Sequence, residues 1–163
     1  MDQLAVDAPY YLIVRAAGND RNDYGPGSLT PHWVWDFDKI EWVLSTESRP
    51  PDGDFDCLAG SAVCKNVLTI GAISDLPSGY DSPQNAVIAS YSSCGPTDDG
   101  RIKPDLVGNG VLLLSTVSFY PYYAESLGTS MAAPNVTGSL LLLQEHYERM
   151  HGVGNFMRAA TLK

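Results

Sequence analysis

The chain has 163 residues, 44% of them hydrophobic and 18% charged, and its formal net charge at pH 7 is −9. This length fits one domain with its own core, and the acidic balance argues against binding to nucleic acid or to anionic membrane surfaces. No apolar run reaches the length of a membrane span, and residues 1–7 lack the basic start and the apolar stretch of a signal peptide.

The first elements predict the start of a parallel α/β sheet. Residues 2–7 indicate the end of a helix, which Pro9 stops because proline cannot continue the hydrogen-bond ladder. The apolar run at residues 10–14 is typical of a strand buried on both faces of a parallel sheet. Functional side chains gather at the carboxyl ends of such strands, where Asn19 brings an amide that can donate to an oxyanion. An asparagine after a glycine is also an ordinary turn residue.

A long connection without clear periodicity occupies residues 20–66. Segments of this length inside a domain are usually functional loops or flexible insertions. Its tryptophans Trp33, Trp35 and Trp42 have two interpretations, which stay open. They attach the loop to the sheet core, or they form a wall of a substrate cleft.

Asp52, Asp54 and Asp56 place three carboxylates at alternate positions, a spacing that can converge on a calcium ion. The pattern departs from a calcium loop because Cys57 stands where such a loop has glycine, and no glutamate follows at the required distance. The three aspartates are therefore candidate ligands for structural calcium, or else solvated turn residues.

Three cysteines fit neither a zinc site nor a dense disulfide framework. Cys57 and Cys64 are close in sequence and can pair in an oxidising compartment, where the closed loop would contribute about 2.5 kcal/mol in the chain-entropy model. Cys94 is then left over, and we interpret it as a small buried residue rather than a reactive thiol.

The second half alternates strand patterns with turns. Strands are predicted at residues 67–73, 86–91, 111–117 and 122–126, because these runs are β-branched or apolar and lie between turn-forming residues. Gly108-Asn109-Gly110 indicates a turn. A helix is predicted from about Gly128 to Met150, and residues 156–162 begin another.

The long helix carries the main functional candidate. Leu140–Leu143 are apolar on every side, which is typical of a helix inside a core. Ser130 lies at its N-terminus, where unpaired N–H groups and the helix dipole favour negative charge. A hydroxyl beside such donors suits acyl transfer, and Gly128 lets another chain approach closely. The alternative is a Ser/Thr N-cap on an ordinary core helix.

The residues at the start of this helix run Gly128-Thr129-Ser130-Met131-Ala132-Ala133-Pro134. This string resembles the nucleophile motif of the subtilisin-like serine peptidases, in which the serine attacks the peptide carbonyl. Three earlier stretches resemble the family in the same order: Ala16-Ala17-Gly18-Asn19-Asp20, Val67-Leu68-Thr69-Ile70-Gly71-Ala72, and Tyr91-Ser92-Ser93-Cys94-Gly95-Pro96 with Lys103-Pro104-Asp105-Leu106. Two positions depart from the family pattern: Gly108-Asn109-Gly110 stands for Ala-Pro-Gly, and Leu127 for a common serine.

The resemblance implies an α/β fold, a partial subtilisin-like fold with a mostly parallel sheet flanked by helices and the nucleophile on a buried central helix. Residues 1–163 would be the C-terminal portion of a peptidase domain. It implies Ser130 as nucleophile and Asn19, with the N–H of Ser130, as the oxyanion hole. The implied substrate-binding residues are Ala16, Ala17, Gly18, Gly128 and Thr129.

The implied substrate is a polypeptide, and the chemistry requires no metal or cofactor, which leaves structural calcium as the one candidate ion. The family also implies a secreted or cell-envelope protein. On that ground, with the cysteine spacing, we expect Cys57 and Cys64 to be bonded and Cys94 to remain a thiol.

The family's catalytic aspartate and histidine precede the asparagine segment, and no residue before Asn19 fits their motifs. The histidines of the chain are His32, His146 and His151, and His146 lies about 24 Å along the helix from Ser130. We therefore expect the base to come from a missing N-terminal half of the domain, which would be a partner of this chain.

Two rival functions remain. One is a truncated or degenerate peptidase module that binds peptides or partners without cleaving them. The other is an esterase of the α/β-hydrolase type, which the sequence disfavours because Gly128-Thr129-Ser130-Met131-Ala132 lacks the second glycine of its motif.

Overall fold

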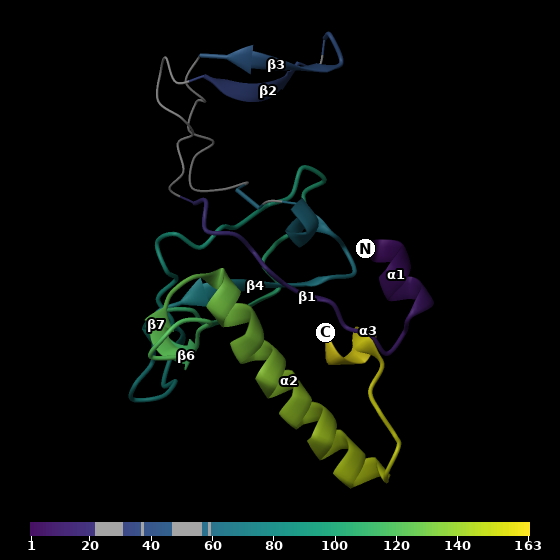
Figure 1. Cartoon of the computed structure of the whole chain (residues 1–163). Helices are drawn as coiled ribbons and strands as arrows, with labels where there is room; N and C mark the ends of the chain where they lie inside the picture. Colours follow the sequence, from purple (N-terminus) through teal and green to yellow (C-terminus); the bar gives the residue numbers. More distant parts are fainter. Residues whose placement is uncertain (22–30, 37, 47–56, 59) are drawn as a thin grey trace.

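The structure is a computed structural model that describes residues 1–21, 31–36, 38–46, 57–58 and 60–163. Its centre is a three-stranded parallel sheet in the order β1-β4-β5 (Figure 1). The sheet strands are β1 (Val14–Ala16), β4 (Leu68–Ile73) and β5 (Leu106–Asn109). One long helix, α2 (Thr129–His151), contacts all three strands. The α/β class expected from the sequence is confirmed.

The remaining elements are short. Helix α1 (Asp2–Asp7) precedes the sheet and helix α3 (Ala159–Leu162) closes the described chain. Two hairpins consist of β2 (His32–Asp36) with β3 (Glu41–Ser45), and β6 (Leu113–Thr116) with β7 (Tyr123–Ser126). Two 3₁₀ turns are η1 (Gly60–Val63) and η2 (Pro83–Asn85).

Strand β4 is the middle of the sheet, and all six of its residues are buried. It pairs with β1 from Val14 opposite Leu68 and with β5 from Ile70 opposite Leu106. Burial on both faces explains why this strand is a continuous apolar run rather than an alternating one. The predicted strand at residues 67–73 is therefore confirmed to within one residue.

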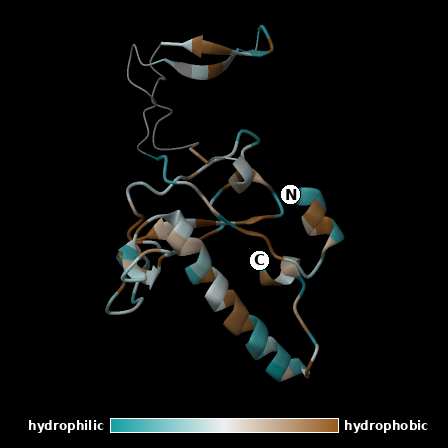
Figure 2. Ribbon diagram, viewed as in Figure 1, coloured by the Kyte–Doolittle hydropathy of each residue, from teal (hydrophilic) through white to brown (hydrophobic). Residues whose placement is uncertain are grey.

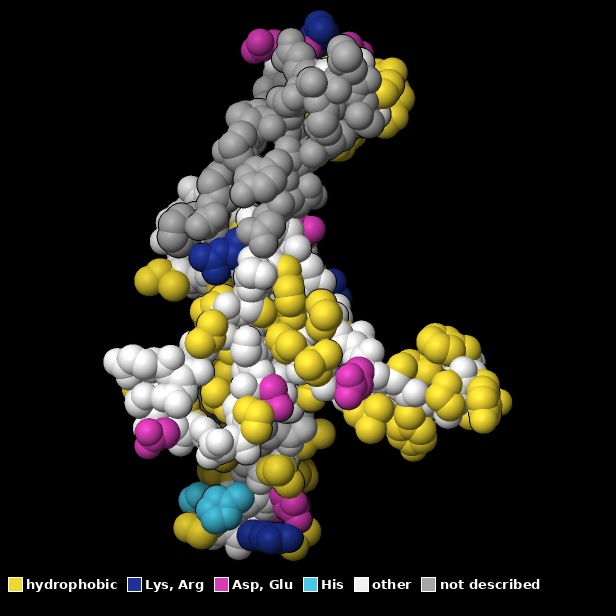
Figure 3. Space-filling model, turned by 90° about the vertical axis from the view of Figure 1, so that its left-hand side faces the viewer, with side chains coloured by type: hydrophobic (Ala, Val, Ile, Leu, Met, Phe, Trp, Pro, Cys, Tyr) yellow, Lys and Arg dark blue, Asp and Glu magenta, His cyan; other side chains and the backbone are white. Residues whose placement is uncertain are grey.

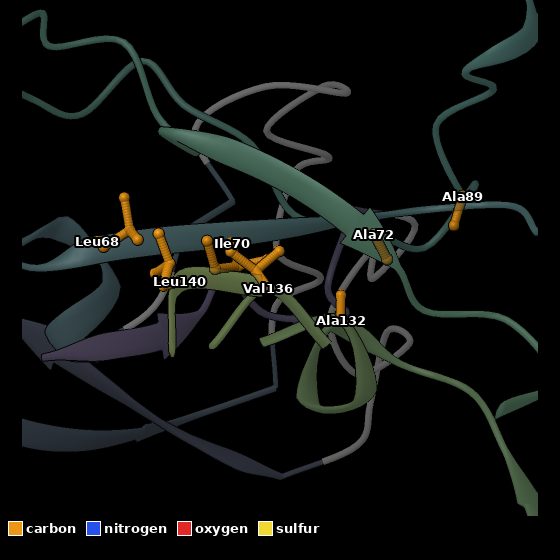
Figure 4. Packing of buried hydrophobic residues seen from close by; sticks show 7 residues of the cluster. All are labelled: Leu68, Ile70, Ala72, Ala89, Ala132, Val136 and Leu140. Atoms are coloured by element: carbon orange, nitrogen blue, oxygen red, sulfur yellow. The ribbon is translucent and has the colours of Figure 1, made fainter. Parts of the chain in front are cut away.

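The core lies between β4 and the first half of α2. Ala132, Val136 and Leu140 recur every four residues on the helix and pack on Leu68, Ile70 and Ala72 (Figure 4). A side chain on Gly108 would lie 2.7 Å from Val136 Cγ2 and 3.0 Å from the carbonyl oxygen of Ala132. The helix can therefore approach β5 this closely only because Gly108 has no Cβ.

The same contact corrects the predicted turn at Gly108-Asn109-Gly110. Strand β5 runs through Gly108 and Asn109, and Gly110 follows the strand directly. A Cβ on Gly110 would lie 2.6 Å from the Cβ of Ala72. Glycine serves close packing here, although in sequence it is indistinguishable from a turn signal.

Burial on every side of α2 was expected at Leu140–Leu143 and holds only for Leu140, which is 7% exposed. Leu141, Leu142 and Leu143 are 66%, 67% and 53% exposed, and Figure 2 shows the hydrophobic band around the middle of the helix. The sheet covers one side of α2, and within the described residues the other sides have no comparable cover.

Two strand predictions were wrong. The run at residues 10–14 forms a strand only from Val14, and Tyr10 and Tyr11 are exposed, because pairing begins where β4 begins. Residues 86–91 form no strand; a single bridge joins Ile88 to Ile73. The predictions at 111–117 and 122–126 are confirmed as the β6–β7 hairpin.

The connection at residues 20–66 contains a hairpin that periodicity did not reveal. In β2 and β3, Trp35 lies opposite Trp42, and the turn is held by Asp36 Oδ1, which accepts from the main-chain N–H groups of Asp38 and Lys39 over 3.0 Å each. Trp33 and Trp42 are 66% and 63% exposed, so they do not attach this segment to the sheet core. Their use as a cleft wall stays a prediction.

The expected disulfide between Cys57 and Cys64 is not formed in this structure. All three cysteines are thiols, each half-buried. Cys57 instead makes main-chain and sulfur contacts with Cys94, while the N–H of Cys64 donates to the carbonyl of Ser61 at the end of η1. Sequence separation suggested the nearer partner, but the fold returns the chain to Cys57 at residue 94.

An ion pair between the buried Lys103 and the partly exposed carboxylate of Asp105 connects the chain before β5 to the start of β4. Lys103 is 5% exposed, and its Nζ donates to Asp105 Oδ2 over 2.6 Å and to the carbonyl oxygen of Val67 over 2.8 Å. Asp105 also accepts from the N–H of Thr69 over 2.7 Å, and Lys163 Nζ lies 3.5 Å from its other oxygen. Burial by itself raises the pKa of Asp105, but the hydrogen bonds from Lys103 and Thr69 and the two nearby lysine charges hold that pKa below its ordinary value.

None of the helices in the described ranges is both long enough and apolar enough to cross a membrane.

One-sided packing of α2 predicts unequal costs for the same substitution at neighbouring positions. Leu140→Ala should lower the free energy of unfolding by about 3 kcal/mol, because it opens a cavity against β4. Leu142→Ala, the matched control on the exposed side, should change it by less than about 0.5 kcal/mol. Urea denaturation followed by circular dichroism measures both, and a comparable loss at Leu142 would contradict one-sided packing.

The Lys103–Asp105 pair predicts acid-sensitive stability. Because the pKa of Asp105 is lower in the folded state than in the unfolded state, its stabilisation is complete above the unfolded pKa of about 4 and is lost as the pH falls through the folded pKa. Asp105→Asn should cost about 3 kcal/mol at pH 7, since it leaves the Lys103 ammonium buried without its partner, and should flatten the acid side of the stability profile.

The exposed Asp98→Asn is the matched control and should leave that profile unchanged. A stability profile that is identical for Asp105→Asn and Asp98→Asn would show that the ion pair contributes nothing.

Candidate active site

The site forms where the end of β1 meets the start of α2. Gly128 precedes the helix with φ of 141°, and its N–H donates to the carbonyl oxygen of Gly110 over 2.8 Å. A Cβ at this position would lie 3.3 Å from Asn19 Nδ2. Both the backbone conformation and the close approach of Asn19 therefore require glycine here.

Asn19 is joined to the helix start across 110 residues of sequence. Its Oδ1 accepts from the main-chain N–H of Thr129 over 2.9 Å and from Thr129 Oγ1 over 3.1 Å. The same Thr129 hydroxyl accepts from the N–H of Gly18 over 3.2 Å. Gly128, the N-cap residue, has no side chain to cap the helix, so Asn19 from β1 supplies the acceptor that a Ser or Asp N-cap usually provides.

These contacts orient the Asn19 amide. Because Oδ1 is held by two donors, Nδ2 is the end left to donate, and no hydrogen bond from it is recorded within the described residues. Ser130, the next residue along the helix, is exposed, and its side chain has no recorded partner there either.

The main-chain N–H groups of the first helical turn differ in whether they have a recorded acceptor. The N–H of Thr129 goes to Asn19, and those of Met131 and Ala132 go to the carbonyl oxygen of Gly128. Ser130 N–H has no recorded acceptor in the described chain. With Asn19 Nδ2 it forms a pair of donors at the positive end of the helix dipole, an arrangement that can stabilise a negatively charged oxygen.

A second layer holds the turn that presents Asn19. The main-chain N–H of Asp20 donates to Ser93 Oγ over 2.9 Å, and the N–H of Ser93 donates to the carbonyl oxygen of Gly18 over 3.0 Å. Tyr91 Oη donates over 2.8 Å to the carbonyl of Gly110, which also receives the N–H of Gly128. The sequence marked Tyr91 and Ser93 as part of a family-like string; their role in positioning both halves of the site is visible only in the fold.

The predicted substrate-binding residues divide into two groups. Ala16 and Gly18 are half-buried near Asn19, whereas Ala17, Gly128 and Thr129 are buried and support the site from within. Contact between any of the five and a substrate stays a prediction.

Ser130 opens onto a groove of about 340 Å³ between α2 and the β6–β7 hairpin. The helix contributes Ser130, Met131, Pro134 and Asn135, and the hairpin contributes apolar and hydroxyl side chains from both strands. Figure 3 shows this side of the molecule, where large hydrophobic side chains cover much of the surface. The groove is therefore lined largely by apolar side chains and lies beside Ser130.

No histidine is seen beside Ser130 in the described part of the chain. His146 and His151 lie near the far end of α2, and the His151 ring packs on Tyr147 with centroids 4.1 Å apart. His146 is about 24 Å from Ser130 along the helix axis at 1.5 Å per residue. His32 belongs to β2, in the separate hairpin.

The calcium candidates Asp52, Asp54 and Asp56 lie outside the described residues. Within those that are described, no three His, Cys, Asp or Glu side chains gather closely enough to hold a metal ion.

Comparison with known proteins found a family model and several relatives. A model of the subtilase family of peptidases matches residues 2–163. The chain is 32% identical to serine protease AprX of Bacillus subtilis over 159 residues, covering 86% of this chain and 35% of AprX. It is 34% identical to an uncharacterised protein of Aquifex aeolicus, covering 80% of this chain and 69% of that protein.

Two solved structures share the fold. The prenylagaramide maturation protease PagA matches 94% of this chain and 38% of its own, with a TM-score of 0.55 and 19% identity. A lanthipeptide protease matches 99% of this chain and 44% of its own, with a TM-score of 0.53 and 19% identity. The chain thus spans less than half of AprX and of both structures.

The capping role of Asn19 predicts opposite results for two substitutions. Asn19→Ala should lower the free energy of unfolding by about 1 kcal/mol, because the N–H of Thr129 loses its acceptor. Asn19→Asp keeps an acceptor and adds negative charge at the positive end of the helix, so stability should be retained or rise by about 0.5 kcal/mol. Chemical denaturation at pH 7 distinguishes them, and equal losses in both variants would contradict the cap.

Proposed function

The chain belongs to the subtilase family, a family of serine peptidases, and from this premise we propose that it contributes the nucleophile and the oxyanion hole of a serine endopeptidase. Ser130 is the nucleophile, and Asn19 with the N–H of Ser130 holds the oxyanion. The observation that carries the proposal is the contact of Asn19 Oδ1 with the N–H of Thr129 at 2.9 Å, which sets the Asn19 amide beside the residue that attacks.

In the first step, Ser130 Oγ adds to the carbonyl carbon of a peptide bond while its proton passes to a general base. The carbonyl oxygen gains negative charge, which the two donors stabilise more strongly than they stabilise the neutral carbonyl. The base then protonates the leaving amine, the C–N bond breaks, and an acyl-enzyme remains on Ser130. Water attacks this ester by the same sequence of steps and releases the acid.

The base and its carboxylate partner come from outside these 163 residues. Two supports are the position of His146 and His151 at the far end of α2 and the place of His32 in a separate hairpin. A serine hydroxyl without a base is a weak nucleophile. The chain by itself is then a poor peptidase, although its oxyanion donors are already in place.

The rest of a peptidase domain is the partner that this arrangement requires. Leu141, Leu142 and Leu143 are exposed around the sides of α2 that the sheet does not cover, and they make this uncovered face of the helix apolar. AprX is nearly three times as long as the part matched here, since that part is 35% of it. Covering this face and supplying the base are two roles of one missing N-terminal half.

A polypeptide is the substrate class, bound in extended form along the groove between α2 and the β6–β7 hairpin. Ala16 and Gly18 are half-buried on the side of Asn19, and both belong to the substrate-binding residues of this proposal. No metal is needed for this chemistry, and structural calcium at Asp52, Asp54 and Asp56 is part of the same proposal. Family membership also supports a secreted or cell-envelope protein.

A non-catalytic peptide-binding module is the second candidate. It is favoured by one observation, the lack of a recorded acid or base contact to Ser130 within the described residues. Both candidates use the same groove, and they differ in whether Ser130 is ever activated.

Active-site labelling separates them. A fluorophosphonate probe should leave the 163-residue chain unlabelled, and should label Ser130 once the chain is joined to, or mixed with, an upstream segment that carries the family's Asp and His. Ser130→Ala in the extended protein should abolish labelling. Mass spectrometry of the labelled peptide reads out the site.

Robust labelling of the 163-residue chain alone would show that the base is internal, and alanine variants at His32, His146 and His151 would then identify it. No labelling in the extended protein, together with retained peptide binding, would favour the non-catalytic module.

In the active extended protein, Asn19→Asp should lower kcat by about 10² to 10³ with little change in KM, because it removes a donor used mainly in the transition state. The magnitude is taken over from subtilisin, a member of the same family. Because Asn19→Asp keeps the helix cap, a loss of activity in a variant of normal stability isolates the oxyanion role. Unchanged kcat would remove Asn19 from the oxyanion hole.

A further inference from the structure

Cys57 and Cys94 are brought together by the fold although 37 positions separate them. The main-chain N–H of Cys57 donates to the carbonyl oxygen of Cys94 over 3.0 Å, and the main-chain N–H of Cys94 donates to Cys57 Sγ over 3.2 Å. Both side chains are half-buried, so a small reagent can reach them. We propose that Cys57 and Cys94 are a disulfide-forming pair, oxidised by a disulfide donor such as glutathione disulfide.

The backbone geometry favours this pair. The main-chain hydrogen bond from Cys57 to Cys94 brings the two backbones side by side, and disulfides join residues whose Cα atoms lie about 4.4–6.8 Å apart. Cys57 Sγ already lies 3.2 Å from the main-chain nitrogen of Cys94, and that nitrogen is three bonds from the sulfur of Cys94. Bond formation then requires the two side chains to rotate so that their sulfur atoms meet.

Cys64 lies in a different setting. Its N–H donates to the carbonyl of Ser61, which places it at the end of η1, and no contact recorded within the described residues joins it to Cys57 or Cys94. A bond from Cys57 to Cys64 would have to replace the existing contacts of Cys57 with Cys94.

Glutathione disulfide is the oxidant that balances the reaction. One cysteine thiolate attacks a sulfur of glutathione disulfide, forming a mixed disulfide and releasing one glutathione thiolate. The second cysteine thiolate then attacks the protein sulfur of that mixed disulfide, forming the Cys57–Cys94 bond and releasing the second glutathione. The protein loses two protons and two electrons, and glutathione disulfide is reduced to two thiols.

The disulfide would restrict the motion of the segments that position Asn19 in the candidate active site. Cys94 directly follows Ser93, whose N–H and hydroxyl hold Gly18 and Asp20 on either side of Asn19. Fixing Cys94 to Cys57 restrains the strand end that presents Asn19, and it also anchors the chain where the long connection returns to the sheet. It would form whether or not the protein cleaves peptides.

Peptide mapping tests the pairing directly. Trypsin cleaves after Lys39, Lys65 and Arg101, whereas Pro50 protects the bond after Arg49, so Cys57 and Cys64 share the peptide 40–65 and Cys94 lies in the peptide 66–101. The full chain is equilibrated with glutathione disulfide, alkylated, and digested without reduction. The expected product is peptide 40–65 linked to peptide 66–101, in a protein that migrates as a monomer.

Cys64→Ser is the matched control and should give the same linked peptides, whereas Cys57→Ser and Cys94→Ser should not. In wild type and Cys64→Ser, oxidation should raise the midpoint of thermal unfolding by about 10 °C over the dithiothreitol-reduced form, and should slow amide hydrogen exchange at residues 18–20.

Four results would overturn the proposal: a bond within peptide 40–65, linked peptides that disappear in Cys64→Ser, a bond between two chains, or three alkylated cysteines after equilibration.

Discussion

The hydrogen bonds between Asn19 and Thr129 connect the sheet to the long helix, and the rest of this structure depends on that connection. A helix N-terminus has main-chain N–H groups without internal partners, and Gly128 has no side chain to satisfy them. Asn19 does so from the end of β1, and its Oδ1 therefore fixes β1, the sheet and α2 relative to one another. The same contact leaves Nδ2 as the end of the amide that can donate, and the N–H of Ser130 likewise has no recorded acceptor among the described residues. In the proposed function, one interaction therefore serves both stability and chemistry.

Close packing between α2 and the sheet supports this connection. Gly108 and Gly110 let α2 approach the sheet to a distance that any Cβ would prevent, and Ala132, Val136 and Leu140 fill the contact. Lys103 and Asp105 hold the opposite end of β5 to β4 with an ion pair in which the lysine is buried. The sheet is thus fixed at both ends, by polar contacts to Thr69 and Val67 on one side and by the Asn19 turn on the other.

The molecule is well packed on one face of α2 and open on the other. The functional proposal follows from this asymmetry. It places the oxyanion donors within the chain, whereas the general base and the residues that cover Leu141–Leu143 would come from outside it. Electrostatic preorganisation and proton transfer are separable contributions to acyl transfer. The proposal assigns the first of them to the residues of this chain.

Local sequence determined the elements whose signals are local: the start of α2 at the Gly128-Thr129-Ser130 string, the buried strand β4, the β6–β7 hairpin, and the identities of Ser130 and Asn19 as candidates. It could not decide which sides of α2 are covered, because Leu140 and Leu142 are the same residue type and differ only in what lies against them. It assigned a turn to Gly108, since a glycine needed for close approach and one needed for chain reversal are identical in sequence. It paired Cys57 with the nearer Cys64, whereas the return of the chain at residue 94 brings Cys94 into contact. Tertiary structure alone decided these points, because each depends on atoms contributed by segments far away in the chain.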